Sequence, residues 1–309
     1  MNNLQPFGLT QGKSLLSTLQ LTGKTAVFIL LWLLVMIFVP IANWVWGEAA
    51  MLRLVSVGVV AQATAVLSIL IGAWGWRETA KTAVIVALLT YAVEFMGSRT
   101  GYPFGRYHYT DLLQPQIGHV PLLIPLAWLM MLPCAWAVAS RFTGWRFALL
   151  SAIALTAWDL MLDPQMVGWG LWVWQQPGGY FGIPWLNFGG WILTAVLLTT
   201  LLRPKPVPVR PLLLIYTLTW FLETFGLAFF WAMPGPAAMG GVVMGLFVWQ
   251  GWRLEIGDWR LRSHNLQSPI SNLQPCHTNS PITTPPTAAG PGIAQKKARP
   301  KVSRNQVRV

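Results

Sequence analysis

Residues 25–46 read TAVFILLWLLVMIFVPIANWVW, an apolar run without a single charged side chain. A membrane-spanning helix needs roughly 20 predominantly apolar residues, so this run is long enough to cross a bilayer. Comparable runs follow along the chain, near residues 55–76, 120–140, 181–202 and 211–232. The sequence therefore predicts several membrane-spanning helices.

Three further segments are apolar but less regular. Those near residues 82–97 and 147–163 end in acidic residues, and the one near 237–252 is short and rich in glycine. This last segment could re-enter the membrane instead of crossing it. Counting all three predicts an all-α, polytopic integral membrane helix bundle of about eight transmembrane helices over residues 25–255.

The composition agrees with a membrane protein. Hydrophobic residues make up 54% of the chain and charged residues 10%, where soluble domains carry about 25% charged residues. The 19 tryptophans suit aromatic belts at the two membrane surfaces. The net charge of +12 comes largely from short loops and the C-terminal tail, a pattern that reports membrane orientation. We therefore expect no nucleic-acid partner.

The same charges predict the orientation of the bundle. With the N-terminus inside, the outside loops contain only Arg53, Arg99 and Arg106. The inside face then contains Lys13, Lys24, Arg77, Lys81, Arg141, Arg146, Arg203, Lys205 and Arg210. This asymmetry is the one that the positive-inside rule describes. We expect both termini to be cytoplasmic, including a short N-terminal segment of residues 1–24.

Residues 263–309 differ from the rest of the chain. They are rich in Pro, Ser, Thr, Asn and Gln and end in a basic stretch. Such a segment buries too little apolar surface to offset the entropy lost on ordering. The composition predicts a disordered basic tail, whose charges could contact anionic lipid.

Four acidic residues fall inside or at the ends of the apolar segments, namely Glu94, Asp159, Asp163 and Glu223. An ionised side chain at membrane depth is costly, so such residues are candidates for function. In the predicted topology their helices run in the same direction, which allows the carboxyl groups to converge in the outer half of the bundle. The alternative is a polar cluster that only packs helices together or pairs with arginine.

Asp159 and Asp163 are four residues apart and should share one helix face. Pro164 disfavours helical geometry at Asp163, which predicts that Asp163 lies near the end of its helix. Burial, the neighbouring carboxylate and the negative end of the helix dipole all oppose a second negative charge there. We expect at least one of the two carboxyl groups to hold a proton near neutral pH, as a general acid requires.

Two loops rich in Gly, Pro and aromatic residues face the same predicted side. Interfacial anchoring explains many of these rings, but the remainder could line a pocket in which aromatic faces stabilise a cation. The candidate pocket residues are Tyr107, Tyr109, Trp169, Trp172, Trp174, Tyr180 and Asn187, together with Glu223.

A metal or cofactor is not expected from the sequence. The acidic residues with His108 and His119 could in principle hold a divalent ion. However, there is neither an Asp-rich repeat for pyrophosphate–magnesium nor a set of His boxes for a di-iron centre, and no nucleotide-binding glycine pattern is present. We therefore predict no metal site and no cofactor.

Four stretches carry a resemblance to a known family. They are EFMGSRTGYPFGRYHYT (residues 94–110), VPLLIPLAWLMM (120–131), WDLMLDPQMVGWGLWVW (158–174) and YFGIPWLNFGGW (180–191). Together they resemble the CruF-type carotenoid biosynthesis family of bacteria and archaea, over roughly residues 80–255. The resemblance implies a hydro-lyase of the carotenoid 1,2-hydratase type in the bacterial inner membrane. Such an enzyme adds water to the terminal C1–C2 double bond of an acyclic carotenoid end group and gives a tertiary alcohol.

The resemblance also implies partners: an acyclic or monocyclic carotenoid, water, membrane lipid and a downstream carotenoid glycosyltransferase. Hydrating such an alkene requires a dry acid, walls that tolerate a cation and a controlled water molecule. From residue chemistry we expect Asp159 and Asp163 to supply the proton as a coupled pair and Glu94 to activate the water. Tyr107 or Asn187 would assist Glu94, while Trp169, Trp172 and Trp174 would flank the cation.

Two other functions fit the same sequence features. One is a membrane transporter or lipid-binding protein whose acidic cluster moves protons. The other is a different membrane enzyme that modifies prenyl lipids.

Overall fold

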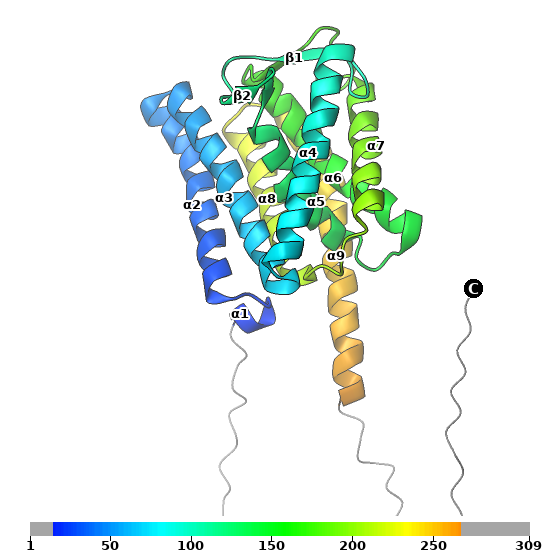
Figure 1. Cartoon of the computed structure of the whole chain (residues 1–309). Helices are drawn as coiled ribbons and strands as arrows, with labels where there is room; N and C mark the ends of the chain where they lie inside the picture. Colours follow the sequence, from blue (N-terminus) through cyan, green and yellow to red (C-terminus); the bar gives the residue numbers. More distant parts are fainter. Residues whose placement is uncertain (1–14, 267–309) are drawn as a thin grey trace, which may run out of the picture. The chain divides into compact units, whose positions relative to one another are not determined.

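The computed structural model describes residues 15–266, and the side chains of residues 16–257. This part of the chain is mostly helical (Figure 1). The helices are α1 (Leu15–Thr18), α2 (Gly23–Trp46), α3 (Glu48–Trp74), α4 (Trp76–Thr100), α5 (Leu123–Val138), α6 (Gly144–Gly168), α7 (Trp185–Leu202), α8 (Val209–Phe229) and α9 (Pro234–Leu266).

Six of these helices, α2, α3, α4, α6, α7 and α8, are long and apolar enough to cross a membrane. Helix α5 is apolar but has only 16 residues. Helix α9 has 33 residues and contains the whole segment near residues 237–252 in one continuous helix. The predicted helical membrane bundle is therefore confirmed, with six helices in the described residues that meet both criteria.

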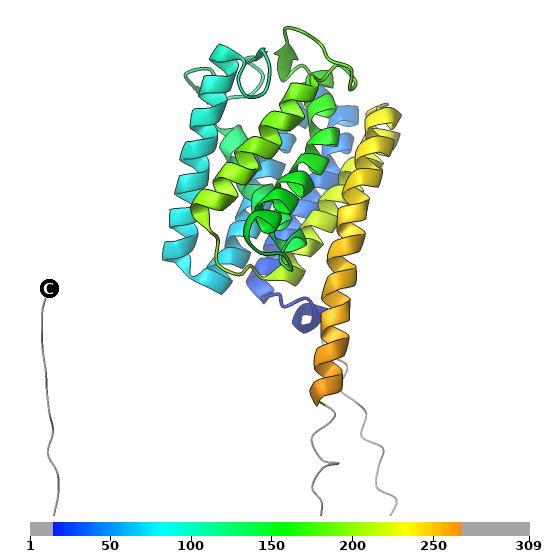
Figure 2. The same ribbon diagram turned by 90° about the vertical axis from the view of Figure 1, so that its right-hand side faces the viewer.

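Helix α5 forms the centre of the bundle. Every residue from Trp128 to Val138 is buried, and α3, α4, α6 and α8 all pack against it. Figures 1 and 2 show α5 enclosed by its neighbours, with α2 lying along α3 on one side. A helix that is apolar on all sides is expected in a core. By contrast, α2 exposes Leu30, Leu34 and Ile37, as expected for a helix that faces lipid.

The two aromatic loops are joined by a short sheet that the all-α prediction did not include. Strand β1 (Tyr107–Tyr109) pairs antiparallel with β4 (Trp172–Trp174), with Tyr107 opposite Trp174 and Tyr109 opposite Trp172. A second pair joins β2 (Gln116–Ile117) to β3 (Val120–Pro121). Because side chains alternate along a strand, the paired Tyr and Trp rings share one face, while His108 and Val173 are exposed.

Asp163 lies near the C-terminal end of α6, as predicted, but Pro164 does not disrupt helical geometry at Asp163. Helix α6 runs through both residues and ends at Gly168. Proline lacks the N–H that would bond to the carbonyl four residues earlier. That carbonyl, on Leu160, instead accepts a hydrogen bond from the Tyr180 hydroxyl at 3.0 Å. The helix can therefore continue past the proline without leaving a carbonyl unpaired.

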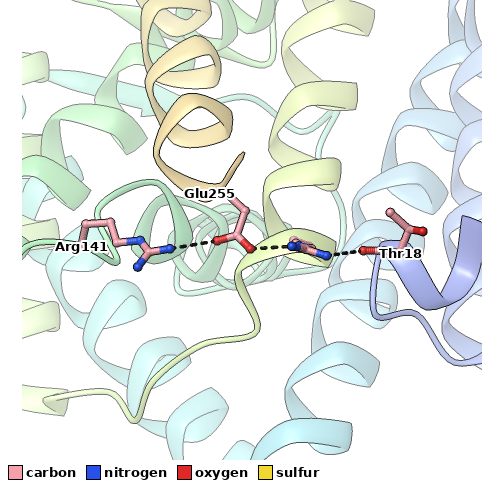
Figure 3. A network of polar contacts seen from close by, with 4 residues as sticks. Thr18, Arg141 and Glu255 are labelled. Atoms are coloured by element: carbon pink, nitrogen blue, oxygen red, sulfur yellow. Dashed lines mark hydrogen bonds and ion pairs between the residues drawn. The ribbon is translucent and has the colours of Figure 1, made fainter. Parts of the chain in front are cut away.

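Charged side chains join several elements at the end of the bundle opposite β1. Glu255 of α9 accepts hydrogen bonds from Arg141 at 3.4 Å and from Arg210 at 2.9 Å (Figure 3). Arg210 also donates to the backbone carbonyl of Thr18 at 2.8 Å. One carboxylate thus links α9 to α8 and to the connection between α5 and α6, and Arg210 extends the link to α1.

Two sequence predictions concern the ends of the chain. Most of the cytoplasmic N-terminal segment and almost all of the disordered tail lie outside the described residues. Helix α9 extends to Leu266, so it includes residues 263–266 of the segment predicted as tail.

Candidate active site

A small cavity lies between α4, α5, α6, α7 and the β1–β4 pair. Its volume is about 40 Å³, whereas a water molecule needs roughly 10–15 Å³ of such space. It is lined by Glu94, Phe104, Tyr107, Tyr109, Ile124, Ala127, Trp128, Asp159, Leu162, Asp163, Trp172, Trp174, Asn187 and Trp191. Three of the four acidic residues singled out in the sequence therefore meet at one cavity, and Glu223 does not.

Asp159 and Asp163 share one amide. Both project from the same face of α6, and the Asn187 side-chain nitrogen donates to Asp159 Oδ2 at 2.9 Å and to Asp163 Oδ2 at 2.6 Å. Trp172 Nε1 donates to the other oxygen of Asp163, Oδ1, at 2.6 Å. Both oxygens of Asp163 thus accept hydrogen bonds, whereas Asp159 Oδ1 is buried and has no hydrogen-bond partner.

Glu94, on α4, is held from the β1 strand. Tyr107 and Tyr109 both donate to Glu94 Oε2, at 2.5 Å and 2.9 Å. Burial first, and then the Glu94 carboxylate, raises the pKa of both tyrosines well above the ordinary value. Both phenols therefore remain O–H donors at any physiological pH. Two donors on one oxygen suit an ionised carboxylate, because such hydrogen bonds are then charge-assisted.

Three buried polar atoms at this cavity lack a hydrogen-bond partner: Asp159 Oδ1 and the indole nitrogens of Trp128 and Trp174. Buried polar groups usually have partners, and each exception calls for an explanation. A water molecule can donate to the Asp159 oxygen and accept from an indole N–H. The polar atoms and the volume therefore match the binding of water.

Close backbone approach shapes the wall of the cavity. Phe104 is buried between Gly97 of α4 and Gly190 of α7. A Cβ atom at Gly97 would lie 2.9 Å from the Phe104 ring, and one at Gly190 would lie 2.6 Å from it. The absence of side chains at these two positions is what lets the ring reach the cavity.

A second, larger cavity of about 680 Å³ lies on the other side of α6. It is lined mostly by apolar residues of α2, α3, α5, α6 and α8. Ile37 and Trp44 of α2 and Phe221 and Phe225 of α8 line it and are exposed, so the cavity opens toward the lipid-facing surface. Glu223 and Trp169 lie here.

Four residues line both cavities, namely Ile124, Ala127, Leu162 and Trp172. The periodicity of α6 explains the division, since successive side chains are about 100° apart around a helix. Asp159 and Asp163 face the small cavity, Trp158 and Gln165 face the large one, and Leu162 contacts both. One layer of side chains therefore separates the acidic pair from the large apolar space.

The candidate pocket residues from the sequence fall into three groups. Tyr107, Tyr109, Trp172, Trp174 and Asn187 line the small cavity, and Trp172 also lines the large one. Trp169 and Glu223 line only the large cavity. Tyr180 lines neither, and its hydroxyl bonds to Leu160 instead.

Sequence reasoning missed several lining residues. Trp128 and Trp191 stack with ring centroids 4.5 Å apart, and Trp191 meets Trp158 edge-on at 6.2 Å. These rings form an aromatic wall from one cavity to the other. Both Trp128 and Trp191 lie in the stretches that carry the family resemblance. For the β1–β4 pair, the sequence signal was the alternation Tyr-His-Tyr and Trp-Val-Trp, which is typical of strands.

Neither histidine considered as a ligand lies at the cavity. His108 is exposed on β1, and His119 contacts Ser98 and Phe95. Among the residues that the structure describes, no three His, Cys, Asp or Glu side chains are arranged to hold a metal ion.

Comparison with known proteins places the chain in a family. A family model described as "Carotenoid biosynthesis protein" matches residues 54–247. The chain belongs to the carotenoid biosynthesis protein family. This confirms the CruF-type resemblance, and the matched residues include every carboxyl group, Tyr and Trp of the two cavities named above except Trp44.

A curated relative adds detail about this carotenoid biosynthesis family. A bisanhydrobacterioruberin hydratase of Haloarcula japonica is 35% identical over 125 residues, which are 38% of this chain and 42% of the relative. The match thus spans less than half of that hydratase. No solved structure matches the chain.

Proposed function

We propose that this protein is a carotenoid hydratase, which adds water to the terminal C1–C2 double bond of an acyclic end group and forms a tertiary alcohol. The observation that carries the proposal is the buried, unpartnered Asp159 Oδ1 at a water-sized cavity faced by two further carboxyl groups. Family membership and the relative named as a hydratase support the same reaction.

The hydrogen bonds support different roles for the two aspartates. Asp163 accepts a donor on each oxygen, which suits an ionised carboxylate. Asp159 has a free oxygen that can carry a proton. Two buried carboxylates so close together oppose each other's ionisation, so one proton shared by the pair belongs on Asp159. We therefore assign Asp159 as the general acid and Asp163 as its ionised partner.

The substrate would enter from the bilayer. The large cavity opens between α2 and α8, and its apolar lining suits an isoprenoid end group. The rest of a long polyene would remain among the lipid chains. The end group would reach Asp159 through the shared layer at Leu162 and Trp172, where small side-chain movements can join the two cavities.

The reaction then needs three proton movements. Asp159 gives its proton to C2, and a tertiary cation forms at C1, flanked by the rings of Trp128, Trp172 and Trp191. Water attacks C1, and its surplus proton passes to Glu94, which Tyr107 and Tyr109 hold in place. Glu94 and Asp159 line the same cavity, so a second water molecule can return the proton to Asp159. The net reaction adds water to the alkene and forms the alcohol, so it requires neither an oxidant nor a reductant.

The membrane arrangement is part of the proposal. We propose that α5 and α9 also cross the bilayer, which gives eight spanning helices over residues 25–255 and places both termini in the cytoplasm. The polar site then lies in the outer half of the bundle in a bacterial inner membrane, and residues 263–309 act as a tail that is dispensable for catalysis. The tertiary alcohol formed would be a suitable acceptor for a carotenoid glycosyltransferase.

The direct test is expression in bacteria engineered to make lycopene or a monocyclic carotene, followed by mass analysis of the pigments. We expect a new pigment heavier by one water, and none with the variant D159N at equal membrane levels. Unchanged pigments in both strains, with the protein inserted, would overturn the proposal. So would a product that has gained oxygen without hydrogen, because that product requires oxidation.

A further inference from the structure

The large cavity contains polar side chains that the proposed hydration does not use. Gln62 from α3, Gln165 from α6 and Glu223 from α8 are the carboxyl and amide residues in an otherwise apolar lining. A carboxyl group in such surroundings is costly unless it has a partner. Because these three polar side chains come from three helices around one cavity, we expect a ligand of this cavity to carry a polar group.

The hydrogen bonds show which of these groups is free. Gln62 Nε2 donates to Thr219 at 3.1 Å and to the Met131 sulfur at 3.3 Å. Thr219 lies one turn before Glu223 on α8, so the Gln62 amide and the Glu223 carboxyl approach the same part of the cavity. The amide N–H of Gln62 is therefore already engaged, whereas Glu223 accepts no hydrogen bond from it.

The second polar group at this part of the cavity is the indole of Trp158. Its ring lies beside the Glu223 carboxyl, yet the buried Nε1 completes no hydrogen bond. The side chain is fully buried and lines the large cavity. An acceptor and a donor, with no completed hydrogen bond between them, thus lie next to each other in an apolar space.

We propose that Glu223 and Trp158 form a subsite for a hydroxyl group of the substrate, so that the enzyme accepts oxygenated isoprenoid chains in preference to pure hydrocarbons. A hydroxyl group has one donor and two acceptor positions. Its O–H would donate to Glu223, and its oxygen would accept from Trp158 Nε1. The assignment of this group to the substrate rests on the proposed hydratase function.

The geometry of α6 limits where that hydroxyl lies. Trp158 and Asp159 are adjacent, so the subsite and the proposed acid lie at the same depth on two sides of one helix. A helix with its side chains is about 10 Å across. The hydroxyl group therefore lies within several carbon atoms of the reacting double bond, and not at the distant end of a long polyene.

Short isoprenoids provide a matched pair of probes. Geraniol carries the same terminal dimethyl alkene as an acyclic carotenoid and a hydroxyl group at its other end, and its deoxy analogue lacks only the oxygen. We would measure both dissociation constants by calorimetric titration of the full-length protein in detergent. Because a hydrogen bond to a carboxylate is among the stronger ones, we expect the alcohol to bind roughly tenfold tighter.

Three variants test the residues. Glu223→Leu should bring the ratio of the two dissociation constants close to one, and Trp158→Phe should lower it by removing only the indole N–H. Glu223→Gln keeps the shape and an acceptor oxygen, and should retain part of the preference, which guards against misfolding of the leucine variant. The matched control is Glu48→Gln, which changes an exposed carboxyl at the start of α3.

The outcomes separate the two proposals. Equal binding of both probes by the wild type, or an unchanged ratio in Glu223→Leu, would overturn the hydroxyl subsite even if pigments are hydrated. A preference for geraniol that depends on Glu223 supports the subsite even if no pigment is hydrated, because the measurement requires no turnover.

Discussion

The Tyr180 hydroxyl donates to the Leu160 carbonyl at 3.0 Å, and that carbonyl lacks its usual donor because residue 164 is proline. The contact keeps α6 helical through Asp163. Asp159 and Asp163 consequently stay one turn apart and reach the same Asn187 amide. A residue outside both cavities thereby positions the acidic pair.

We predict that Tyr180→Phe lowers the free energy of unfolding by about 1 kcal/mol, because it leaves the partly buried Leu160 carbonyl unpaired. Burial raises the pKa of Tyr180 to about 12, so the donor is present at ordinary pH. Thermal unfolding in detergent measures the effect. Tyr102→Phe, at an exposed tyrosine, is the control, and an equal loss there would contradict the positioning role.

The contact between Tyr180 and Leu160 could not be predicted from the sequence, whereas the convergence of the acidic residues could. The convergence of Glu94, Asp159 and Asp163 could be predicted, because carboxyl groups within apolar helices must share polar surroundings. The continuation of α6 past Pro164 could not be predicted, since it depends on the Tyr180 hydroxyl, which lies 20 residues after the Leu160 carbonyl that it bonds. Likewise, the pairing of β1 with β4 joins loops separated in the sequence by two helices, α5 and α6, and only the alternating aromatic pattern indicated it.

The cavity that Glu223 lines also could not be predicted from the sequence. The position of Glu223 on an apolar helix made it a candidate pocket residue, but helix direction alone grouped it with the other three acidic residues. The packing of α8 against the opposite side of α6 places it in the large cavity. Which face of a helix meets which neighbour is a tertiary property that one sequence does not specify.

The acid assignment gives the second prediction. Asp159→Asn should lower turnover by about 10²–10⁴-fold, the usual range for loss of a general acid. Asp163→Asn should lower turnover by a smaller factor, because the amide oxygen of asparagine still accepts one of the two hydrogen bonds. The measurement is hydroxylated pigment per unit of membrane-inserted protein. A dead Asp163→Asn beside an active Asp159→Asn would exchange the two roles.

Glu94→Gln extends this test to the water side of the reaction. The amide cannot accept the proton that the attacking water releases, so we expect a loss in the same range of about 10²–10⁴-fold. If this variant and both aspartate variants stay active, the cluster has only a structural role.

The third prediction concerns the contact between Gly190 and Phe104. A methyl group at Gly190 would lie 2.6 Å from the Phe104 ring and 2.7 Å from the Pro103 carbonyl oxygen. Gly190→Ala should therefore destabilise the protein by about 1–3 kcal/mol, as overpacking does, and lower activity by moving Phe104. Gly189→Ala is the matched control, because nothing lies within 4 Å of its added carbon. Similar stability of the two variants would contradict the proposed close fit.

The fourth prediction tests the link through Glu255. Glu255→Gln weakens its contacts with Arg141 and Arg210, which are partly shielded from solvent, and should cost about 1 kcal/mol of unfolding free energy. Glu78→Gln, at the more exposed pair with Lys205, should cost less than about 0.5 kcal/mol. Chemical unfolding at low and high salt measures both. Equal, small effects would show that Glu255 does not hold α9 to the bundle.

The last prediction concerns α5, on which the count of eight spanning helices depends. Its 16 residues rise only about 24 Å at 1.5 Å per residue, less than the roughly 30 Å of a hydrocarbon core. Helix α5 can nevertheless cross, because the surrounding helices and not lipid cover its ends. Asp111 and Thr143 lie in the connections before and after it and are exposed.

In a Cys276→Ser background, Asp111→Cys should react with a membrane-impermeant maleimide on intact cells, and Thr143→Cys should react only after permeabilisation. That result places the aromatic loops outside and the Arg141 connection in the cytoplasm. Labelling of both positions from the same side would mean that α5 does not cross. Reversed labelling would keep the crossing but invert the bundle and move the polar site to the cytoplasmic half.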